Sequence, residues 1–245
     1  MRFQFVDCRW QLGEPERGRE LYLEGHIPGA SFLDVERELS VAQPAGTVGG
    51  RHPLPTAEAF ADAAGRAGIG DGVFVVAYDQ GMNGGGARLW WLLRHFGHDE
   101  VAVLDGGIGV WLGPLQAGEE EIEPTRFTPR MRSGEVVEAE ELEARLGEEG
   151  LVVVDARAGE RYRGEVEPMD PVAGHIPGAL NVPYTGDGEL PPEVLSADEI
   201  VLYCGSGVTA CVDLLWLARA GRPDAKLYPG SWSDWAARGL PAARG

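Results

Sequence analysis

The chain of 245 residues contains one internal repeat, which limits its possible folds more than any single motif does. Four landmarks occur twice in the same order: a Val-Asp-x-Arg run, a Gly-His-Ile-Pro-Gly-Ala run, an apolar run, and a glycine followed by tryptophan. Their positions are 6–9 and 154–157, 25–30 and 174–179, 73–79 and 199–204, and 104–111 and 227–235. Four ordered matches predict two domains of the same fold.

The distance between the copies is not constant along the chain. It is 149 residues at the repeated histidine, His26 against His175, and 125 at the end of the apolar run, Asp79 against Cys204. The second copy therefore lacks 24 residues that the first copy has. The extra stretch of the first copy includes a helical pattern over 57–67, for which Thr56 is a suitable N-cap.

Each copy alternates β-prone apolar runs with helical patterns. The expected strands are 3–7, 73–78, 101–104, 151–155, 199–203 and 226–228, and the other expected helices are 87–96, 139–146 and 210–220. This alternation predicts an α/β fold in which each domain has a mainly parallel sheet with helices on both faces. Three prolines and an acidic run interrupt the pattern between the copies. We therefore expect domains at 1–115 and 133–245, joined by a linker at 116–132.

The charge and cysteine content exclude several classes of protein. Asp and Glu total 39 against 21 Lys and Arg, so the net charge is −18, which disfavours nucleic acid and anionic membranes as partners. No run approaches the roughly 18 apolar residues that a membrane span needs. The N-terminal residues lack a signal-peptide pattern. Three cysteines without a Cys-x-x-Cys pair argue against disulfides or structural zinc and favour a cytoplasmic setting.

One cysteine stands where reactive groups are often placed. Cys204 ends a β-prone run and precedes a Gly-Ser-Gly loop, after which a helical pattern begins at Ala210. The loop N–H groups and the helix N-terminus would stabilise a thiolate or persulfide anion. The N–H groups expected to do so belong to Gly205, Gly207, Val208 and Thr209. The first copy has Asp79 at this position, so we expect only the second domain to be catalytic.

These residues together resemble a two-domain, rhodanese-family sulfurtransferase along nearly the whole chain. The resemblance implies two tandem rhodanese-like domains, of which the first is inactive. It also implies that Cys204 takes sulfane sulfur from 3-mercaptopyruvate or thiosulfate as a persulfide and passes it to cyanide or a thiol. Neither a metal nor an organic cofactor is required. The implied partners are small-molecule donors and acceptors, together with a thioredoxin-like reductant.

The resemblance also assigns individual site residues. Arg161 is placed as the donor-anion binder, and a Ser-His-acid relay corresponds to Ser206, His52 and Glu36, where the family has aspartate at the acid position. The Cys-Gly-Ser-Gly-Val-Thr loop favours 3-mercaptopyruvate as donor. Met169 stands where that branch of the family has a second arginine, which keeps thiosulfate open as the donor.

Several other residues are expected to have structural roles only, and two functions other than sulfurtransferase are considered. His26, His175 and the Asp-Arg pairs occur in both copies, so they should be structural, and Trp232, Trp235, Cys8 and Cys211 should be packing residues. Cys211 has the alternative role of resolving an oxidised Cys204. A cysteine phosphatase would need arginine where Ala210 stands, which disfavours that function. A carrier that delivers persulfide to a protein partner remains open.

Overall fold

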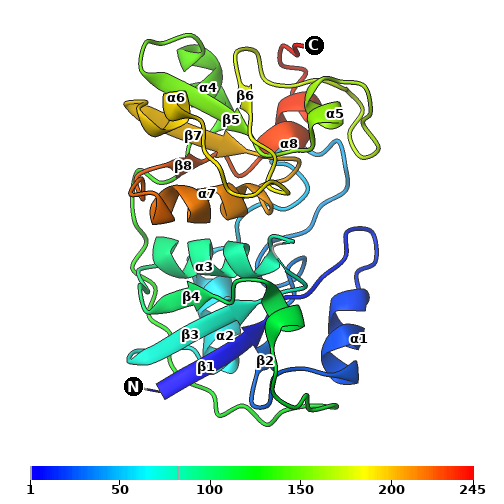
Figure 1. Cartoon of the computed structure of the whole chain (residues 1–245), viewed down its shortest axis with the longest axis vertical. Coiled ribbons are helices and arrows are strands. Elements are labelled where there is room, and N and C mark those ends of the chain that lie inside the picture. Colours follow the sequence, from blue (N-terminus) through cyan, green and yellow to red (C-terminus); the bar gives the residue numbers. More distant parts are fainter. Residues whose placement is uncertain (1, 82) are drawn as a thin grey trace. The chain divides into compact units, whose positions relative to one another are not determined.

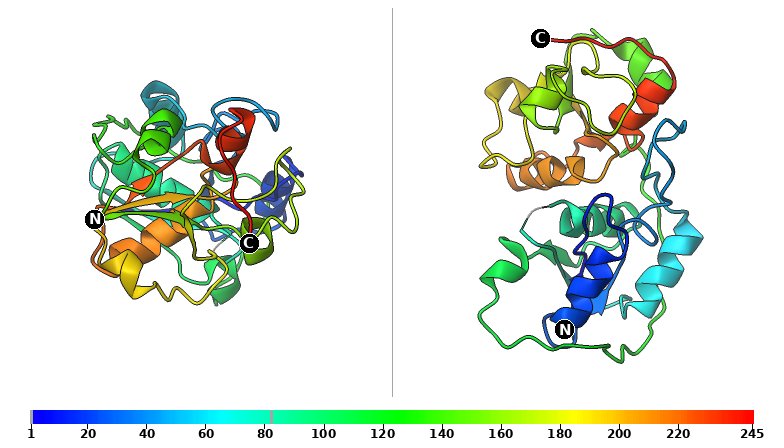
Figure 2. Two further views of the ribbon diagram at one scale, coloured as in Figure 1. Left: turned by 90° about the horizontal axis from the view of Figure 1, so that it is seen from above. Right: turned by 90° about the vertical axis from the view of Figure 1, so that its right-hand side faces the viewer.

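The computed structural model describes residues 2–81 and 83–245, and the chain forms two compact units. The first unit contains Met1–Val41 and Leu54–Arg132, and the second contains Ala42–Pro53 and Ser133–Gly245. A segment from the first half of the sequence therefore belongs to the second unit. In Figures 1 and 2 this light-blue segment lies beside α8 (Ser231–Ala237), the orange-red helix of that unit.

The first unit is built on a parallel sheet of four strands in the order β2-β1-β3-β4. The strands are β1 (Arg2–Asp7), β2 (Ser31–Phe32), β3 (Val73–Tyr78) and β4 (Val101–Val103). The helices are α1 (Arg17–Glu24), α2 (Ala57–Arg66), α3 (Gly85–His95) and the short 3-10 helix η1 (Gly107–Val110). The hydroxyl of Thr56 accepts the N–H of Ala59 at 3.1 Å, which confirms Thr56 as the N-cap of α2.

The second unit repeats this topology, with a parallel sheet in the order β6-β5-β7-β8. Its strands are β5 (Leu151–Asp155), β6 (Leu180–Asn181), β7 (Glu199–Tyr203) and β8 (Lys226–Leu227). Besides α8, its helices are α4 (Ala139–Arg145), α5 (Gly159–Tyr162), α6 (Pro192–Leu195) and α7 (Ala210–Arg219). The predicted duplication and the predicted α/β class are therefore confirmed.

Alternation along the strands places helices on both sides of the second sheet. Val153 and Val201 project to one face and join a buried cluster with Trp232 and Trp235 of α8 and with residues of α4. The alternate residues along these strands, such as Leu202 of β7, point to the other face of the sheet, and α7 packs against that face. Both tryptophans are fully buried, as expected, and the burial of their large apolar rings stabilises this face of the sheet.

The duplicated Asp-Arg pairs make the same contacts in both units. Arg9 donates to Asp7 at 2.6 Å and to the carbonyl of Gly25 at 2.7 Å. Arg157 donates to Asp155 at 2.6 Å and likewise to a carbonyl beside the repeated histidine. Because both pairs tie the end of a strand to the following loop, the structural interpretation is confirmed.

The duplicated histidines also have equivalent partners. Nδ1 of His26 lies 2.8 Å from the carbonyl oxygen of Tyr22, and Nδ1 of His175 lies 2.8 Å from that of Tyr162. Each imidazole is stacked on the same tyrosine, with ring centroids 4.0 and 3.8 Å apart respectively. These contacts fix the turn before each Ile-Pro-Gly run, so the histidines have the expected structural role.

Two parts of the chain differ from the simplest sequence expectation. The second copy is 24 residues shorter, yet it keeps one helical turn, α6, where the first copy has the ten-residue α2. The segment 116–132 follows the first unit closely, since Gln116 pairs with His26 and the N–H of Arg130 donates to Phe96.

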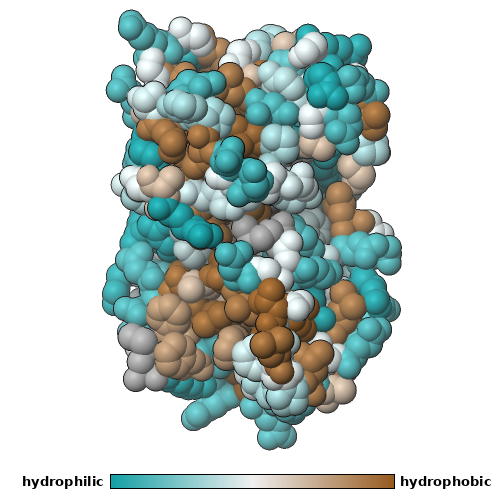
Figure 3. Space-filling model, in the orientation of Figure 1, coloured by the Kyte–Doolittle hydropathy of each residue, from teal (hydrophilic) through white to brown (hydrophobic). Residues whose placement is uncertain are grey.

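The surface carries mixed side chains. Hydrophilic residues cover most of the face in Figure 3, with hydrophobic residues gathered over part of the first unit. Phe3, Leu112 and Leu115 are among the exposed large hydrophobic residues of that unit. No helix in the described ranges 2–81 and 83–245 is both long and apolar enough to cross a membrane.

Candidate active site

The candidate site is centred on Cys204, which directly follows β7. The sulfur accepts the N–H of Gly207 at 3.1 Å, and the residue is only 1% exposed. Gly207 has a φ of +81°, and a β-carbon there would lie 2.4 Å from the carbonyl oxygen of Pro229. Only glycine can therefore let the loop curl back so that an N–H faces the sulfur.

The floor of the loop is formed by the start of α8. The hydroxyl of Ser231 accepts the N–H of Cys204 at 3.2 Å and donates to the carbonyl of Tyr228 at 3.0 Å. The N–H groups of Trp232 and Ser233 donate to the carbonyls of Cys204 and Gly205. Ser231 has a φ of +56°, which is uncommon for a residue with a side chain. This strained serine fixes the backbone that carries the sulfur.

The structure brings Ser206 and His52 together. Nδ1 of His52 lies 2.7 Å from the hydroxyl oxygen of Ser206, and both residues are buried. The segment 42–53 is held against α8, since the N–H of Gly49 donates to Asp234 at 2.6 Å. Gly50 has a φ of +82°, and a β-carbon on it would lie 2.4 Å from the carbonyl oxygen of Gly230. This docking places the imidazole beside the cysteine loop.

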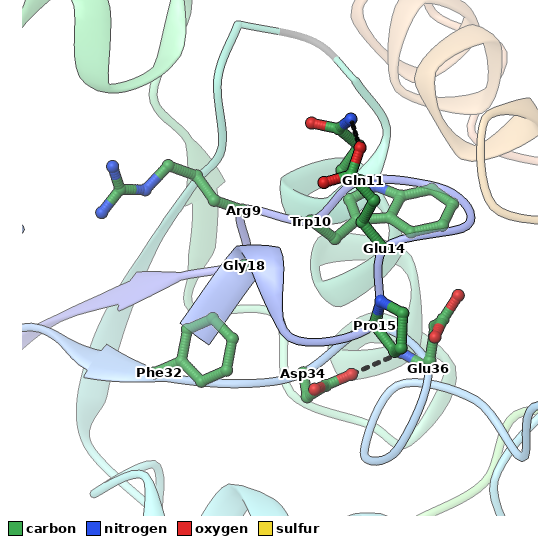
Figure 4. Close-up of a pocket in the computed structure, with 9 residues that line it drawn as sticks. All are labelled: Arg9, Trp10, Gln11, Glu14, Pro15, Gly18, Phe32, Asp34 and Glu36. Carbon is green, nitrogen blue, oxygen red and sulfur yellow. Dashed lines mark hydrogen bonds between the residues drawn. The ribbon is translucent and has the colours of Figure 1, made fainter. Parts of the chain in front are cut away.

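Glu36, the expected acid of the relay, belongs to the first unit. Its N–H donates to the carboxylate of Asp34 at 2.8 Å. Figure 4 shows its side chain at the edge of a small cavity, opposite Glu14 and close to Pro15. That cavity has a volume of about 10 Å³, enough for roughly one water molecule, so it is too small for a sulfur donor. The role of Glu36 in a relay stays a prediction.

Two arginines approach Gly205, the residue after the cysteine. A β-carbon on Gly205 would lie 3.0 Å from Nη2 of Arg51 and 3.4 Å from Nη1 of Arg161. Arg51 pairs with Asp170 at 2.5 Å, and Arg161 pairs with Glu167 at 2.6 Å. Arg161, which the resemblance assigned to the site, therefore lies beside the cysteine loop and is paired with the carboxylate of Glu167.

Electrostatic effects mark two more side chains near the sulfur. Burial raises the pKa of the Tyr184 hydroxyl, the charge on Cys204 adds to that rise, and Arg161 opposes it. Asp213 on α7 is fully buried, and neither of its oxygens has a hydrogen-bond partner in the described part of the chain. Burial raises its pKa well above the usual range, and the negative charges of Cys204 and Asp155 add to the effect.

The other cysteines have different surroundings. Burial raises the pKa of the Cys8 thiol well above its usual value, and the charge of Asp7 adds to this rise. The thiol of Cys211 lies 3.5 Å from the carbonyl oxygen of Gly207. Both residues are completely buried, in agreement with the packing roles expected for them.

The equivalent loop of the first unit holds a carboxylate. The two oxygens of Asp79 accept the N–H groups of Gly81 at 2.8 Å and Gly86 at 3.1 Å, at the start of α3. The first unit thus has a built-in anion where the second unit has the sulfur of Cys204. Two N–H groups of this loop already donate to Asp79, and the loop contains no cysteine that could take up sulfur.

Comparison with known proteins identifies the family. The rhodanese-like domain matches residues 2–113 and 138–238, so the chain belongs to the rhodanese-like family, with two such domains. More particularly, a Pseudomonas aeruginosa protein named a probable 3-mercaptopyruvate sulfurtransferase is 45% identical, over 94% of this chain and 88% of that protein. SseB of Mycobacterium tuberculosis, provisionally named a thiosulfate sulfurtransferase, is 40% identical over 94% and 86% of the two chains. The structure of the 3-mercaptopyruvate sulfurtransferase SseA from Escherichia coli matches with a TM-score of 0.78 and 34% identity, covering 94% of this chain and 92% of that one.

Sequence reasoning missed several residues of the site. Arg51 precedes His52 directly, so the signal was a second basic residue in the same loop, but its proximity to Gly205 depends on how that loop docks. Asp170 lies 119 residues further along the chain, and no local pattern indicates its pairing with Arg51. Ser231 has no signal in the sequence, because its significance lies in a backbone angle.

Proposed function

We propose that the chain is a sulfurtransferase that moves sulfane sulfur from 3-mercaptopyruvate or thiosulfate to cyanide or a thiol through a persulfide on Cys204. The observation that carries this proposal is the contact between the sulfur of Cys204 and the N–H of Gly207. An anionic sulfur is stabilised by such a donor both before and after it accepts a second sulfur atom. Two relatives named for 3-mercaptopyruvate favour that donor.

The first half-reaction breaks the carbon–sulfur bond of the donor. The Cys204 thiolate attacks the sulfur of 3-mercaptopyruvate, a sulfur–sulfur bond forms, and the electron pair of the broken bond goes to the carbon of the departing enolate. That carbon takes one proton to give pyruvate. Ser206 and His52 are hydrogen-bonded to each other at 2.7 Å beside the loop, so they are suited to deliver this proton. Glu36 completes the proposed relay.

The second half-reaction returns the enzyme to its starting state. A cyanide ion or thiolate attacks the outer sulfur of the persulfide, the sulfur–sulfur bond breaks, and the electron pair remains on Cys204. The loop N–H groups of Gly205, Gly207, Val208 and Thr209 stabilise the charge in both steps, and Arg161 binds the anionic part of the donor.

The remaining parts of the proposal concern the whole chain. The domain at 1–115 is catalytically inactive, the linker is 116–132, and the domain at 133–245 carries the cysteine, with the segment 42–53 packed against it. The enzyme acts in the cytoplasm, and a thioredoxin-like reductant serves as one acceptor. Delivery of persulfide to a protein partner is the alternative function.

Replacement of the nucleophile tests the proposal. Steady-state transfer from each donor to cyanide should be lost in Cys204→Ser, because an alcohol cannot hold sulfane sulfur. Cys8→Ala, which removes a buried and inert thiol in the first unit, should retain the wild-type rate. A Cys204→Ser protein that transfers sulfur at the wild-type rate would refute the assignment of the site.

A further inference from the structure

The two guanidinium groups beside Gly205 lie close enough to share one ligand. The position that a β-carbon would take on Gly205 lies 3.0 Å from Nη2 of Arg51 and 3.4 Å from Nη1 of Arg161. The two nitrogens can therefore be no more than 6.4 Å apart. A carboxylate that accepts a charge-assisted bond of about 2.8 Å at each oxygen can span such a gap. The shared point lies on the residue that follows Cys204.

Arg51 has donors left over for a ligand. It is 5% exposed, Nη1 is used by Asp170, and Nε is buried with no hydrogen-bond partner in ranges 2–81 and 83–245. Burying a charged donor without a partner is costly, so such groups are normally paired. The nitrogen that faces Gly205 is Nη2, on the side of the cysteine loop.

Asp170 and Glu167 form ion pairs with Arg51 and Arg161. One oxygen of Asp170 pairs with Arg51, and the other lies 3.8 Å from Nη2 of Arg161 and has no hydrogen bond to any described residue. Glu167 holds Arg161 through Nε and Nη2. Glu167 thus holds the fork of Arg161 by hydrogen bonds, Asp170 holds that of Arg51, and Nη1 of Arg161 is directed to the loop.

We propose that Arg51 is the second donor-binding residue, and that with Arg161 it holds the carboxylate of 3-mercaptopyruvate beside Cys204. This inference rests on the proposed function and deepens it. Met169 stands where the 3-mercaptopyruvate branch of the family has a second donor-binding arginine. In this chain Arg51, from the segment 42–53, supplies that second guanidinium group instead. Specificity for the donor thus depends on a residue from the other half of the sequence.

The charge balance of this cluster favours a singly charged donor. Three arginines are matched by three carboxylates: Arg51, Arg157 and Arg161 against Asp155, Glu167 and Asp170. The site therefore offers directed hydrogen bonds rather than excess positive charge. A planar monoanionic carboxylate suits two forked donors better than the dianion thiosulfate does, because a second negative charge beside the thiolate is repelled.

Kinetics of Arg51→Lys and Arg51→Met test this role. Both variants should raise the KM for 3-mercaptopyruvate by about 10- to 100-fold, the loss of one charged hydrogen bond, with a smaller change in kcat. The inhibition constant of pyruvate, the product that keeps the carboxylate, should rise by a similar factor. Arg51→Lys keeps a positive charge opposite Asp170, so it tests the fork in a protein that folds. Arg163→Met, which removes an exposed arginine paired with Glu165, should change neither constant.

A double variant separates ligand binding from charge balance. Arg51→Met combined with Asp170→Leu removes both buried charges, so it should fold yet keep the raised KM and the weak inhibition by pyruvate. A return to wild-type constants in the double variant would show that Arg51 only neutralises Asp170, and the inference would be overturned. Unchanged constants in Arg51→Lys would overturn it as well. Wild-type protein that forms no persulfide on Cys204 would instead refute the proposed function itself.

Discussion

Cys204 differs from the other cysteines in the groups that surround its sulfur. Its sulfur accepts an N–H of the following loop, and its backbone N–H donates to Ser231. By contrast, burial raises the pKa of the Cys8 thiol well above its usual value, and the charge of Asp7 adds to that rise. The small residues after Cys204 made this position predictable from the sequence, because they indicate a loop whose N–H groups turn inward. The strain at Ser231 was not predictable, since backbone angles leave no pattern in the residue types.

The contact between Ser206 and His52 predicts coupled effects on the donor step. Ser206→Ala should lower the rate of pyruvate release by about 10²-fold, and His52→Asn should lower it to a similar extent, because both belong to one proton path. The double variant should then be little slower than either single variant. Single-turnover measurement of pyruvate release provides the comparison. Independent, additive losses would contradict a shared proton path.

Charged partners distant in the sequence mark the limit of residue-level prediction. The family resemblance assigned Arg161 as the donor-anion binder, and its proximity to Gly205 agrees with that assignment. Arg51 and Asp170 could not be paired in advance, because their contact depends on the tertiary docking of a loop. The resemblance showed that Met169 stands where the family branch has an arginine, but nothing in the sequence indicated that Arg51 could take its place.

At the scale of elements, length decided what could be predicted. Strands β3, β5 and β7 and helices α2, α3 and α7 span enough residues for an apolar period to stand out. The four-residue helices α5 and α6 are too short to show a period. Helix α8 has seven residues, as does α4, which was predicted over 139–146, but α8 was not predicted and its tryptophans were recognised only as core residues.

The docked segment 42–53 offers a matched pair of glycines for a test. Gly46 and Gly50 both have positive φ, but a β-carbon on Gly46 would meet no atom within 4 Å, whereas one on Gly50 would lie 2.4 Å from the carbonyl oxygen of Gly230. Gly46→Ala should cost about 1 kcal/mol of stability and leave the KM for 3-mercaptopyruvate unchanged. Gly50→Ala should displace the segment and raise that KM at least several-fold, since the segment carries Arg51 and His52. Equal kinetic behaviour of the two variants would contradict this account of the docking.

Helix α7 carries a buried acid that should make stability depend on pH. The raised pKa of Asp213 means that the folded protein keeps a proton that the unfolded chain has released. The free energy of unfolding attributable to this residue should therefore fall as the pH rises above about 4. Asp213→Asn should remove that slope and increase stability relative to wild type at neutral pH. Urea unfolding of both proteins at several pH values measures the difference, and parallel curves would show that Asp213 is ionised in the folded state.

At the scale of the whole molecule, one fold occurs twice and only one copy holds the thiol. The strand orders β2-β1-β3-β4 and β6-β5-β7-β8 are equivalent, and the histidine contacts recur in each unit. The cysteine loop has its counterpart in a loop whose N–H groups are occupied by Asp79. The repeat was readable in the sequence, whereas the assignment of residues 42–53 to the second unit was not, because chain order gives no sign of it.

The most direct test of the central claim is the mass of the peptide that contains Cys204 after the reduced, folded protein has met 3-mercaptopyruvate without an acceptor. We predict a gain of one sulfur atom, about 32 Da, on that peptide and its loss when cyanide is added. The peptides of Cys8 and Cys211 should keep their masses. A Cys204 peptide of unchanged mass, or a sulfur atom gained at another cysteine, would contradict the account.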